Sequence, residues 1–291
     1  MAHHKPAAAS PTQRKTAGET LLELDGVSIS FGGLRAVDRL SFGVQRGQIV
    51  ALIGPNGAGK TTVFNLITGV YRPTGGCIRW RGEDVTGLAS HRIAQLGIRR
   101  TFQTIRLFAD MTVLDNVMAG LHLQIRQRWW QGLLATPAQR REEQALVERA
   151  MAVLHKLKLA DVAHDNATSL PYGVQRRVEL ARTLVAKPEL IILDEPAAGL
   201  NENESAGLND TIRAIRDSGV TVILVEHDMS VVMSVADHIV VINFGKKIAQ
   251  GTPAQIRNDP LVIEAYLGQD DADDANDAPL PRGAQPGQAA P

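Results

Sequence analysis

The sequence of 291 residues has a single cysteine, Cys77, and lacks long hydrophobic runs. One cysteine excludes a disulfide framework within the chain, so a reducing cytoplasm is the simplest expectation. No apolar stretch approaches the roughly 18 residues that a membrane-spanning helix needs. Residues 1–19 also lack the apolar segment of a secretory signal. If the protein works at a membrane, we expect another chain to provide the spanning helices.

Neither sign of charge is in excess, because Lys and Arg total 31 and so do Asp and Glu. This balance gives no indication of an overall nucleic-acid-binding surface, and we expect no nucleic acid among the partners. Hydrophobic residues make up 44% of the chain, which is enough for a core. The acidic run that starts at Asp270 leads into a segment rich in Pro, Gly and Ala. We therefore predict disordered tails at residues 1–19 and 269–291, around a folded domain of residues 20–268.

The most informative segment fits the pattern G-x-x-x-x-G-K-[ST], and its residues are Gly54, Pro55, Asn56, Gly57, Ala58, Gly59, Lys60, Thr61 and Thr62. It follows the apolar run Ile49–Ile53, which is typical of a buried strand, and precedes a segment that can begin a helix. A chance glycine-rich turn is the alternative, but both flanks match the functional context. Such glycines let backbone N–H groups surround phosphate oxygens at a helix start. We predict a nucleoside-triphosphate site in which Lys60 contacts the β- and γ-phosphates and Thr61 binds Mg²⁺.

The segments around this loop predict an α/β fold. Before it, residues 22–31 and 40–44 alternate as strands of an antiparallel sheet would. After it, apolar strands are predicted at Leu190–Leu193, Val220–Val225 and Ile239–Ile242, and the segments between them are helical. Strands that alternate with helices indicate a parallel sheet that is covered on both faces.

The region from Val113 to roughly Leu159 loses this strand character and becomes helical, and we predict an inserted helical subdomain at about residues 104–186. Its buried helix face is marked by apolar residues at spacings of three and four, namely Val147, Ala150, Met151, Leu154 and Leu157. The predicted fold class is therefore a P-loop NTPase core of the RecA type, with an N-terminal antiparallel β-subdomain and an inserted α-helical subdomain.

Two carboxylates, Asp194 and Glu195, come at the C-terminal end of the predicted strand Leu190–Leu193. Open α/β sheets bind ligands at that end of their strands. Neighbouring residues of a strand point to opposite faces, so we expect different roles for the two. Asp194 is suited to hold Mg²⁺ through water, and Glu195 is suited to polarise an attacking water. An acidic pair in an ordinary turn is the alternative, and the preceding P-loop argues against it.

His227 follows the predicted strand Val220–Val225 and therefore emerges at the same edge of the sheet. A single histidine is usually uninformative. At this edge, contact with the γ-phosphate or a sensor role is the favoured interpretation.

With these residues in place, the chain resembles the ATP-binding subunit of an ABC transporter from about Leu21 to Leu267. The resemblance implies that two such subunits trap ATP with Mg²⁺ between them. Phe31 matches the aromatic residue that stacks on adenine, with an ordinary core residue at a strand end as the alternative. Gln103 matches the glutamine that contacts Mg²⁺ and senses the γ-phosphate. The implied catalytic set is thus completed by Gln103, beside Lys60, Glu195 and His227.

The resemblance also identifies segments that act across the dimer. Residues 198–201 match the loop that reaches toward the partner, and residues 170–177 match the signature that closes over the partner's ATP. Gly173 and Gln175 are the signature residues expected to approach that nucleotide through the start of a helix.

The signature departs from the usual L-S-G-G-Q form at Pro171, Tyr172 and Val174. Pro171 lacks the serine hydroxyl that contacts phosphate, a loss of about 1 kcal/mol. In a heterodimer this loss falls on the partner's site. We therefore predict that the site containing Lys60 and Glu195 is the more competent one.

Four further segments resemble the ATPases of branched-chain amino acid importers, namely residues 100–103, 196–201, 226–229 and 265–268. The insert with Trp129 and Trp130 resembles the larger of the two ATPase subunits of that system. For these tryptophans, the edge of a core and contact with a membrane surface both stay open. Importers of urea and short amides use similar ATPases, so they remain alternatives for the solute.

The resemblance implies an ATPase coupled to transmembrane transport at the cytoplasmic face of the cell (inner) membrane, as a peripheral protein. Its implied partners are a second ABC ATPase subunit in a homo- or heterodimer, two transmembrane permease subunits and, indirectly, a solute-binding protein. One rival is a soluble ABC ATPase of translation or DNA repair, but the second cassette or long coiled-coil insertion of those proteins does not appear. Another is a regulatory module that never hydrolyses ATP. The presence of Glu195 and His227 argues against it.

Overall fold

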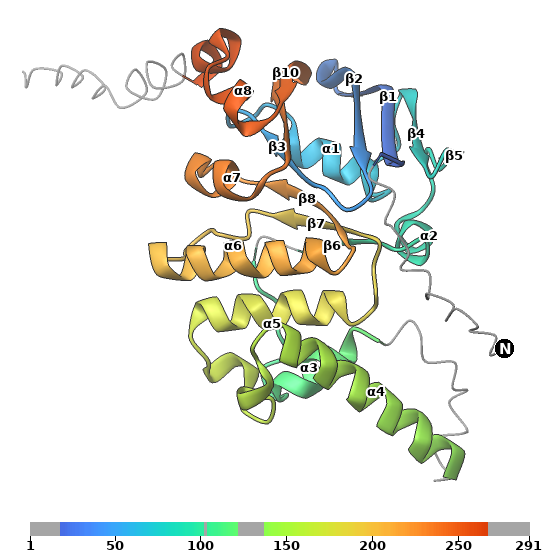
Figure 1. The fold of residues 1–291 in the computed structure, drawn as a ribbon. Helices are drawn as coiled ribbons and strands as arrows, with labels where there is room; N and C mark the ends of the chain where they lie inside the picture. The colour runs from blue at the N-terminus through green and yellow to red at the C-terminus, as the bar shows by residue number, and fades with distance from the viewer. Residues whose placement is uncertain (1–17, 102–103, 122–136, 267–291) are drawn as a thin grey trace, which may run out of the picture.

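The structure is a computed structural model that describes residues 18–101, 104–121 and 137–266. The strands of these residues form two sheets, and helices pack beside and between them (Figure 1). Among the described helices, none combines the length and apolar character needed to cross a bilayer.

The first sheet is antiparallel, with the strand order β2-β1-β4-β5. Its strands are β1 (Thr20–Phe31), β2 (Leu34–Gln45), β4 (Gly75–Trp80) and β5 (Glu83–Asp84). Gly32 and Gly33 form the turn between β1 and β2, and both adopt positive φ angles. The predicted antiparallel sheet ahead of the P-loop is confirmed, although register shifts interrupt the pairing of β1 with β2.

The second sheet has the order β10-β9-β3-β8-β7-β6. Its strands are β3 (Ile49–Ile53), β6 (Ile98–Arg100), β7 (Leu190–Asp194), β8 (Thr221–Val225), β9 (His238–Asn243) and β10 (Lys246–Gly251). All pairs are parallel except β9 with β10 at one edge. The sequence did not predict β10, because an edge strand with Lys246, Lys247 and Gln250 needs no apolar alternation.

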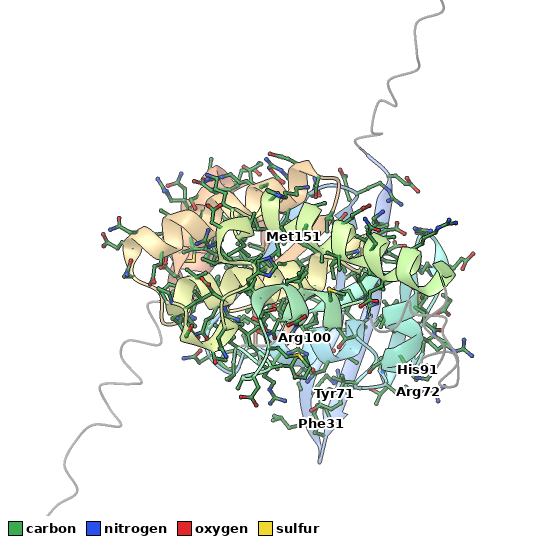
Figure 2. The ribbon with its side chains drawn as sticks, turned by 90° about the horizontal axis from the view of Figure 1, so that it is seen from below. Phe31, Tyr71, Arg72, His91, Arg100 and Met151 are labelled. Carbon is green, nitrogen blue, oxygen red and sulfur yellow. The ribbon has the colours of Figure 1, made fainter. Side chains whose placement is uncertain are left out.

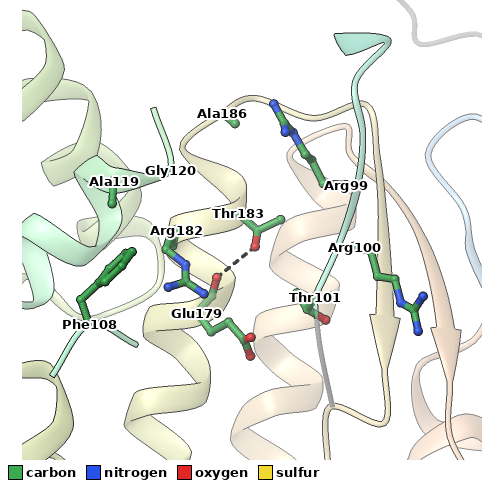
Figure 3. A pocket seen from close by; sticks show the side chains of 10 residues that line it. All are labelled: Arg99, Arg100, Thr101, Phe108, Ala119, Gly120, Glu179, Arg182, Thr183 and Ala186. Carbon is green, nitrogen blue, oxygen red and sulfur yellow. Dashed lines mark hydrogen bonds between the residues drawn. The ribbon is translucent and has the colours of Figure 1, made fainter. Parts of the chain in front are cut away.

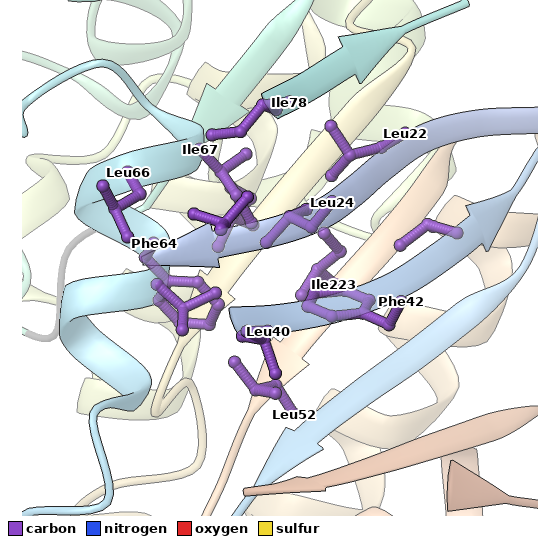
Figure 4. Packing of buried hydrophobic residues seen from close by; sticks show 14 of the residues in the cluster. Leu22, Leu24, Leu40, Phe42, Leu52, Phe64, Leu66, Ile67, Ile78 and Ile223 are labelled. Carbon is purple, nitrogen blue, oxygen red and sulfur yellow. The ribbon is translucent and has the colours of Figure 1, made fainter. Parts of the chain in front are cut away.

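Helix α1 (Lys60–Ile67) lies between the two sheets, as Figure 4 shows. Phe64 and Ile67 pack in one cluster with Leu24 of β1, Phe42 of β2 and Ile223 of β8. Burial against both sheets fixes the axis of α1, so the P-loop is held at the C-terminal end of β3.

The other face of the parallel sheet is covered by α6 (Glu202–Asp217), and α5 (Tyr172–Leu184) packs beyond α6 (Figure 1). Strand β7 serves both faces, because Leu190 and Ile192 pack with α1 while Ile191 and Leu193 pack with the helices. The predicted double coverage of a parallel sheet is therefore confirmed.

Residues 104–186 contain α3 (Val113–Ala119), α4 (Pro137–Lys156), α5 and two short 3-10 helices, η3 (Ala160–Val162) and η4 (Ala167–Ser169). On α4 and just beyond it, Ala150, Leu154 and Leu157 are buried, while Val147 and Met151 are partly exposed. The limits of the helical subdomain and of the folded domain stay predictions.

Three smaller helices are α2 (Ser90–Gln95), α7 (Met229–Val235) and α8 (Pro253–Arg257), and residues 260–266 are also helical. Helix α7 begins directly after the His227 segment and packs with the sheet through Val232.

Candidate functional site

The glycines of the P-loop adopt backbone angles that other residues rarely take. Gly54, Gly57 and Gly59 have φ angles of 155°, 77° and 101°. A Cβ atom on Gly54 would lie 2.0 Å from the carbonyl oxygen of Ile242, and one on Gly59 would lie 2.6 Å from that of Ala36. A Cβ on Gly57 would meet no described atom within 4 Å. Two of the glycines are thus required by close packing, and the third lies beside open space.

Helix α1 begins at Lys60, with Gly59 at its N-cap. Gly59 has no side chain that could accept from the first N–H groups of the helix, and the first turn, Lys60 to Thr62, contains no acidic residue. These N–H groups and the helix dipole therefore form an anion-binding end of the kind that holds phosphate.

The Lys60 side chain is 9% exposed and folds back over the loop. Its Nζ donates to the carbonyl oxygens of Gly54 at 2.5 Å and Pro55 at 2.9 Å. Burial lowers the pKa of the Lys60 ammonium, and the negative charges of Glu195 and Asp194 oppose that change. The predicted lysine and both predicted carboxylates therefore lie close enough to interact.

Asp194 ends β7 and is paired with Arg100 of β6. The Arg100 Nη2 donates to Asp194 Oδ2 at 2.6 Å, and its Nη1 donates to Asn65 Oδ1 on α1 at 2.7 Å. The guanidinium also lies 5.7 Å from the ring centroid of Phe64. Arg100 thus joins β7 to the P-loop helix. In the sequence, Arg100 stands out only within segment 100–103, which resembles the family, and no local pattern indicates its pairing with Asp194.

Glu195 lies just beyond β7 and has a φ of 44°. The expectation that both carboxylates are strand residues is therefore wrong for Glu195, because the chain turns there into the left-handed region. Its Oε1 lies 4.0 Å from Nδ1 of His227, which is 62% exposed at the end of β8. The structure thus places Glu195 and His227 beside each other.

Phe31 ends β1 and is 43% exposed, which does not fit the alternative of a core residue. The ring of Tyr71 meets it edge to face, with a centroid distance of 5.1 Å (Figure 2). Tyr71 is also partly exposed. Sequence reasoning missed Tyr71, because 40 residues separate the two rings and Tyr71 belongs to no motif.

The signature residues lie at the start of α5, across the parallel sheet from α1 (Figure 1). Gln175 Nε2 donates to the carbonyl oxygens of Leu170 at 2.7 Å and Thr168 at 3.1 Å, so this side chain closes the preceding turn. A Cβ on Gly173 would lie 3.0 Å from Oε1 of Glu204 at the start of α6. Within this chain, Gly173 and Gln175 are therefore not brought to the P-loop.

Several predicted residues lie outside the described part of the chain. These are Gln103, Trp129, Trp130 and the end of the predicted segment 265–268.

A cavity of about 390 Å³ lies where β6 meets α3 and α5 (Figure 3). Arg99 lines it from β6, and Arg182 lines it from α5. The Arg182 guanidinium lies 5.9 Å from the ring centroid of Phe108, which lines the same cavity. The lining therefore combines cationic and aromatic side chains with the carboxylate of Glu179.

A P-loop follows β3, two carboxylates lie at the C-terminal end of β7, and a histidine follows β8, which is the arrangement of an ATP-binding cassette. A model of the ABC transporter family matches residues 37–198, and a model of the branched-chain amino acid ATP-binding cassette transporter matches residues 246–272. The chain belongs to the ABC transporter family, in which ATP hydrolysis is coupled to transport.

Two relatives are similar over nearly their whole length. The high-affinity branched-chain amino acid transport ATP-binding protein BraF of Pseudomonas aeruginosa is 49% identical, over 86% of this chain and 98% of that protein. The corresponding protein LivG of Escherichia coli is 47% identical, over 86% of this chain and 99% of its own length. Among solved structures, an ATP-binding cassette of an ABC transporter in its ADP conformation superimposes with a TM-score of 0.75 at 30% identity, covering 86% of this chain and 99% of that one.

Proposed function

We propose that this chain hydrolyses ATP to power the uptake of branched-chain amino acids. The names of BraF and LivG and the family model at residues 246–272 support this solute. The observation that carries the ATPase mechanism is the convergence of Lys60, Glu195 and His227 at one edge of the parallel sheet.

Each of these side chains has a separate task in the proposed reaction. The P-loop N–H groups cradle the phosphates, and Lys60 exchanges its loop carbonyls for phosphate oxygens. Glu195 accepts a hydrogen bond from the attacking water and orients it. His227, 4.0 Å from Glu195, holds the γ-phosphate against that water. Phe31 and Tyr71 offer an aromatic surface for the base.

The residues at this edge also fit a magnesium ion. The Thr61 hydroxyl and the Asp194 carboxylate are hard oxygen donors, which Mg²⁺ prefers. Among the described residues, no cluster of three or more His, Cys, Asp or Glu could hold a metal alone. A site with few protein ligands suits Mg²⁺, which commonly completes its shell with substrate phosphates and water. The bound ion would neutralise charge that develops on the phosphates. Gln103 remains proposed as a further contact.

We assign the signature to the other site of a dimer. Gly173 and Gln175 lie at the start of α5, away from this chain's own P-loop, so they are available to a second ATPase subunit. Closure of such a dimer around ATP would move the helical layer relative to the sheets.

We place the permease contact at the cavity between β6 and α5. Its lining of Arg99, Arg182 and Phe108 suits a helix end that presents carbonyl or carboxylate oxygens. The two permease subunits and a solute-binding protein would complete the importer, with this chain peripheral at the cytoplasmic face of the inner membrane. Arg182→Glu should prevent co-purification with the permease, whereas Arg257→Glu on α8 should not. Equal recovery with both variants would contradict this placement.

Substitution of Glu195 by Gln tests the proposed chemistry. With MgATP, the assembled transporter that contains this variant should bind ATP and retain it, while steady hydrolysis falls to background. Rapid steady hydrolysis by the variant would reject Glu195 as the residue that activates water. Retention without turnover would support it, since binding depends on the P-loop.

The solute requires its own experiment. The transporter that co-purifies with this chain, reconstituted in vesicles, should accumulate labelled leucine when ATP is supplied. Accumulation of urea or a short amide instead would favour the importers kept as alternatives. Co-purification with ribosomes or DNA rather than membrane proteins would favour the soluble class.

A further inference from the structure

A buried hydrogen bond joins the ends of β7 and β8. The backbone N–H of Ala197 donates to Oε1 of Glu226 at 2.7 Å. Glu226 directly precedes His227, and Ala197 comes two residues after Glu195. Glu226 is fully buried and Ala197 is 9% exposed. The Glu226 side chain therefore links the segment that contains His227 to the segment that contains Glu195.

The turn at Glu195 has to be held by its surroundings. A φ of 44° is unfavourable for a residue with a Cβ, because in the left-handed region the Cβ lies close to the following carbonyl oxygen. The Glu195 N–H donates to the Val225 carbonyl at 2.9 Å, and Nη2 of Arg176 on α5 lies 3.4 Å from the Glu195 carbonyl oxygen. The contact from Glu226 to Ala197 fixes the other end of the same turn.

The choice of a carboxylate here is informative, because a buried carboxyl is expensive. Burial raises the pKa of Glu226, and the nearby Glu195 charge adds to that effect. Among the described residues, Oε2 of Glu226 has no hydrogen-bond partner. A residue whose only purpose was to fill the core would be apolar. From another segment, the N–H of Ala197 donates a hydrogen bond to the Glu226 carboxylate.

We propose that Glu226 is a positioning residue for ATP hydrolysis, which fixes the Ala197 N–H and thereby the orientation of Glu195 relative to His227. This inference rests on the proposed role of Glu195. Glu226 itself is buried behind the turn, so it acts through the backbone and not on the nucleotide.

Strand β8 offers a matched control at its opposite end. Oγ1 of Thr221 accepts from the backbone N–H of Gly47 at 2.9 Å, and Thr221 is also fully buried. Thr221→Val removes a buried acceptor of one backbone N–H, as does Glu226→Met, whose side chain is similar in size to glutamate. Glu226→Gln keeps an acceptor oxygen and removes the ionisable group.

Hydrogen exchange of the full chain tests the contact without reference to catalysis. In the native sequence, the Ala197 amide should exchange slowly. Glu226→Met should speed its exchange about tenfold, the effect of one hydrogen bond, and Glu226→Gln should change it less than about threefold. Thr221→Val should affect Gly47 and leave Ala197 unchanged. An Ala197 amide that exchanges at the unprotected rate in the native sequence would overturn the proposal, even if Glu226→Met did not fold.

Kinetics of the assembled transporter with MgATP test the consequence. Glu226→Met should lower kcat about tenfold and change the KM for ATP less than about twofold, because the P-loop is untouched. Glu226→Gln should restore most of kcat, and Thr221→Val should retain it. Equal losses in the Gln and Met variants, or an equal loss in Thr221→Val, would overturn the positioning role. If Glu195 did not orient the attacking water, the Glu195→Gln variant would still hydrolyse ATP, and this separate result would distinguish the two failures.

Discussion

The P-loop and the start of α5, the two segments that we propose to bind nucleotide, are built differently. Lys60 is 9% exposed and hydrogen-bonded, and Gly54 and Gly59 are required by close backbone contacts. At the start of α5, Pro171 and Tyr172 are exposed. The P-loop is shaped by contacts within its own chain, whereas the start of α5 is proposed to receive its nucleotide from a second subunit.

The supports of the two segments also differ. The P-loop helix packs between two sheets, so its position is set by the core. The start of α5 is set by the turn that Gln175 closes and by close approach of Gly173 to Glu204. We infer that substitutions in the P-loop act on folding and binding together, while those at the start of α5 act mainly on the assembled dimer.

The largest effect is expected for Lys60→Ala. Two charge-assisted hydrogen bonds to phosphate are worth at least about 3 kcal/mol, so affinity for MgATP should fall by about 100-fold or more. Titration with a fluorescent ATP analogue measures this. Lys156→Ala, at the exposed end of α4, is the control. Binding by Lys60→Ala within about threefold of the native value would contradict a phosphate role.

Substitutions of two P-loop glycines distinguish the cost of a steric clash from the cost of an unfavourable backbone angle. Gly54→Ala should lower the free energy of unfolding by about 3 kcal/mol or more, because its Cβ collides with the Ile242 carbonyl and its φ is positive. Gly57→Ala should cost only about 1–2 kcal/mol, because its φ is positive but the space is open. Urea unfolding of both variants tests the difference. Equal losses of unfolding free energy in the two variants would show that the atoms around Gly54 shift to make room for the added Cβ.

A pH titration of stability addresses the buried carboxyl after β8. Burial raises the pKa of Glu226 above its ordinary 4.5, so the folded state binds this proton more tightly than the unfolded state. That contribution is present below 4.5 and is lost as the pH rises through the folded value. Glu226→Gln stays neutral, so its stability relative to the native sequence should increase from pH 4.5 to 8. A stability difference between the two proteins that does not change with pH would contradict the raised pKa of Glu226. Glu83→Gln on the exposed strand β5 is the control for the Glu-to-Gln substitution itself.

The smallest effect is expected at Pro171, the N-cap of α5. Pro171→Ser restores a hydroxyl near the partner's phosphate and a favourable cap, worth about 1 kcal/mol. In a heterodimer, turnover at the partner's site should rise up to about fivefold, measured with Glu195→Gln in this chain. Pro171→Ala should give no such rise, since it adds no hydroxyl. An increase at the site of Lys60 instead would contradict the assignment of the signature to the partner.

Sequence patterns predicted those parts of the candidate site whose residues lie together in one short segment of the chain. The P-loop, the acidic pair at the end of β7 and His227 each come at the end of an apolar strand, and parallel strands bring these ends to one edge. The roles of these residues stay predictions. Phe31 was singled out by resemblance, and its exposure favours a ligand-binding surface over a core position.

The rest depends on contacts between distant segments. Three contacts of this kind join residues that are far apart in the sequence, and nothing in the sequence pairs them. They are the contacts of Tyr71 with Phe31, of Arg100 with Asp194 and of Glu226 with Ala197. The left-handed turn at Glu195 was missed for a related reason. The apolar run before it indicates a strand but does not indicate where that strand ends.

The single cysteine offers a direct way to count subunits. Cys77 is partly exposed on β4, in the sheet that does not carry the carboxylates. Because the sequence has no other thiol, one spin label per chain can be attached without removing any residue. A labelled homodimer would give a dipolar signal between two identical positions, and a heterodimer with an unlabelled partner would give none.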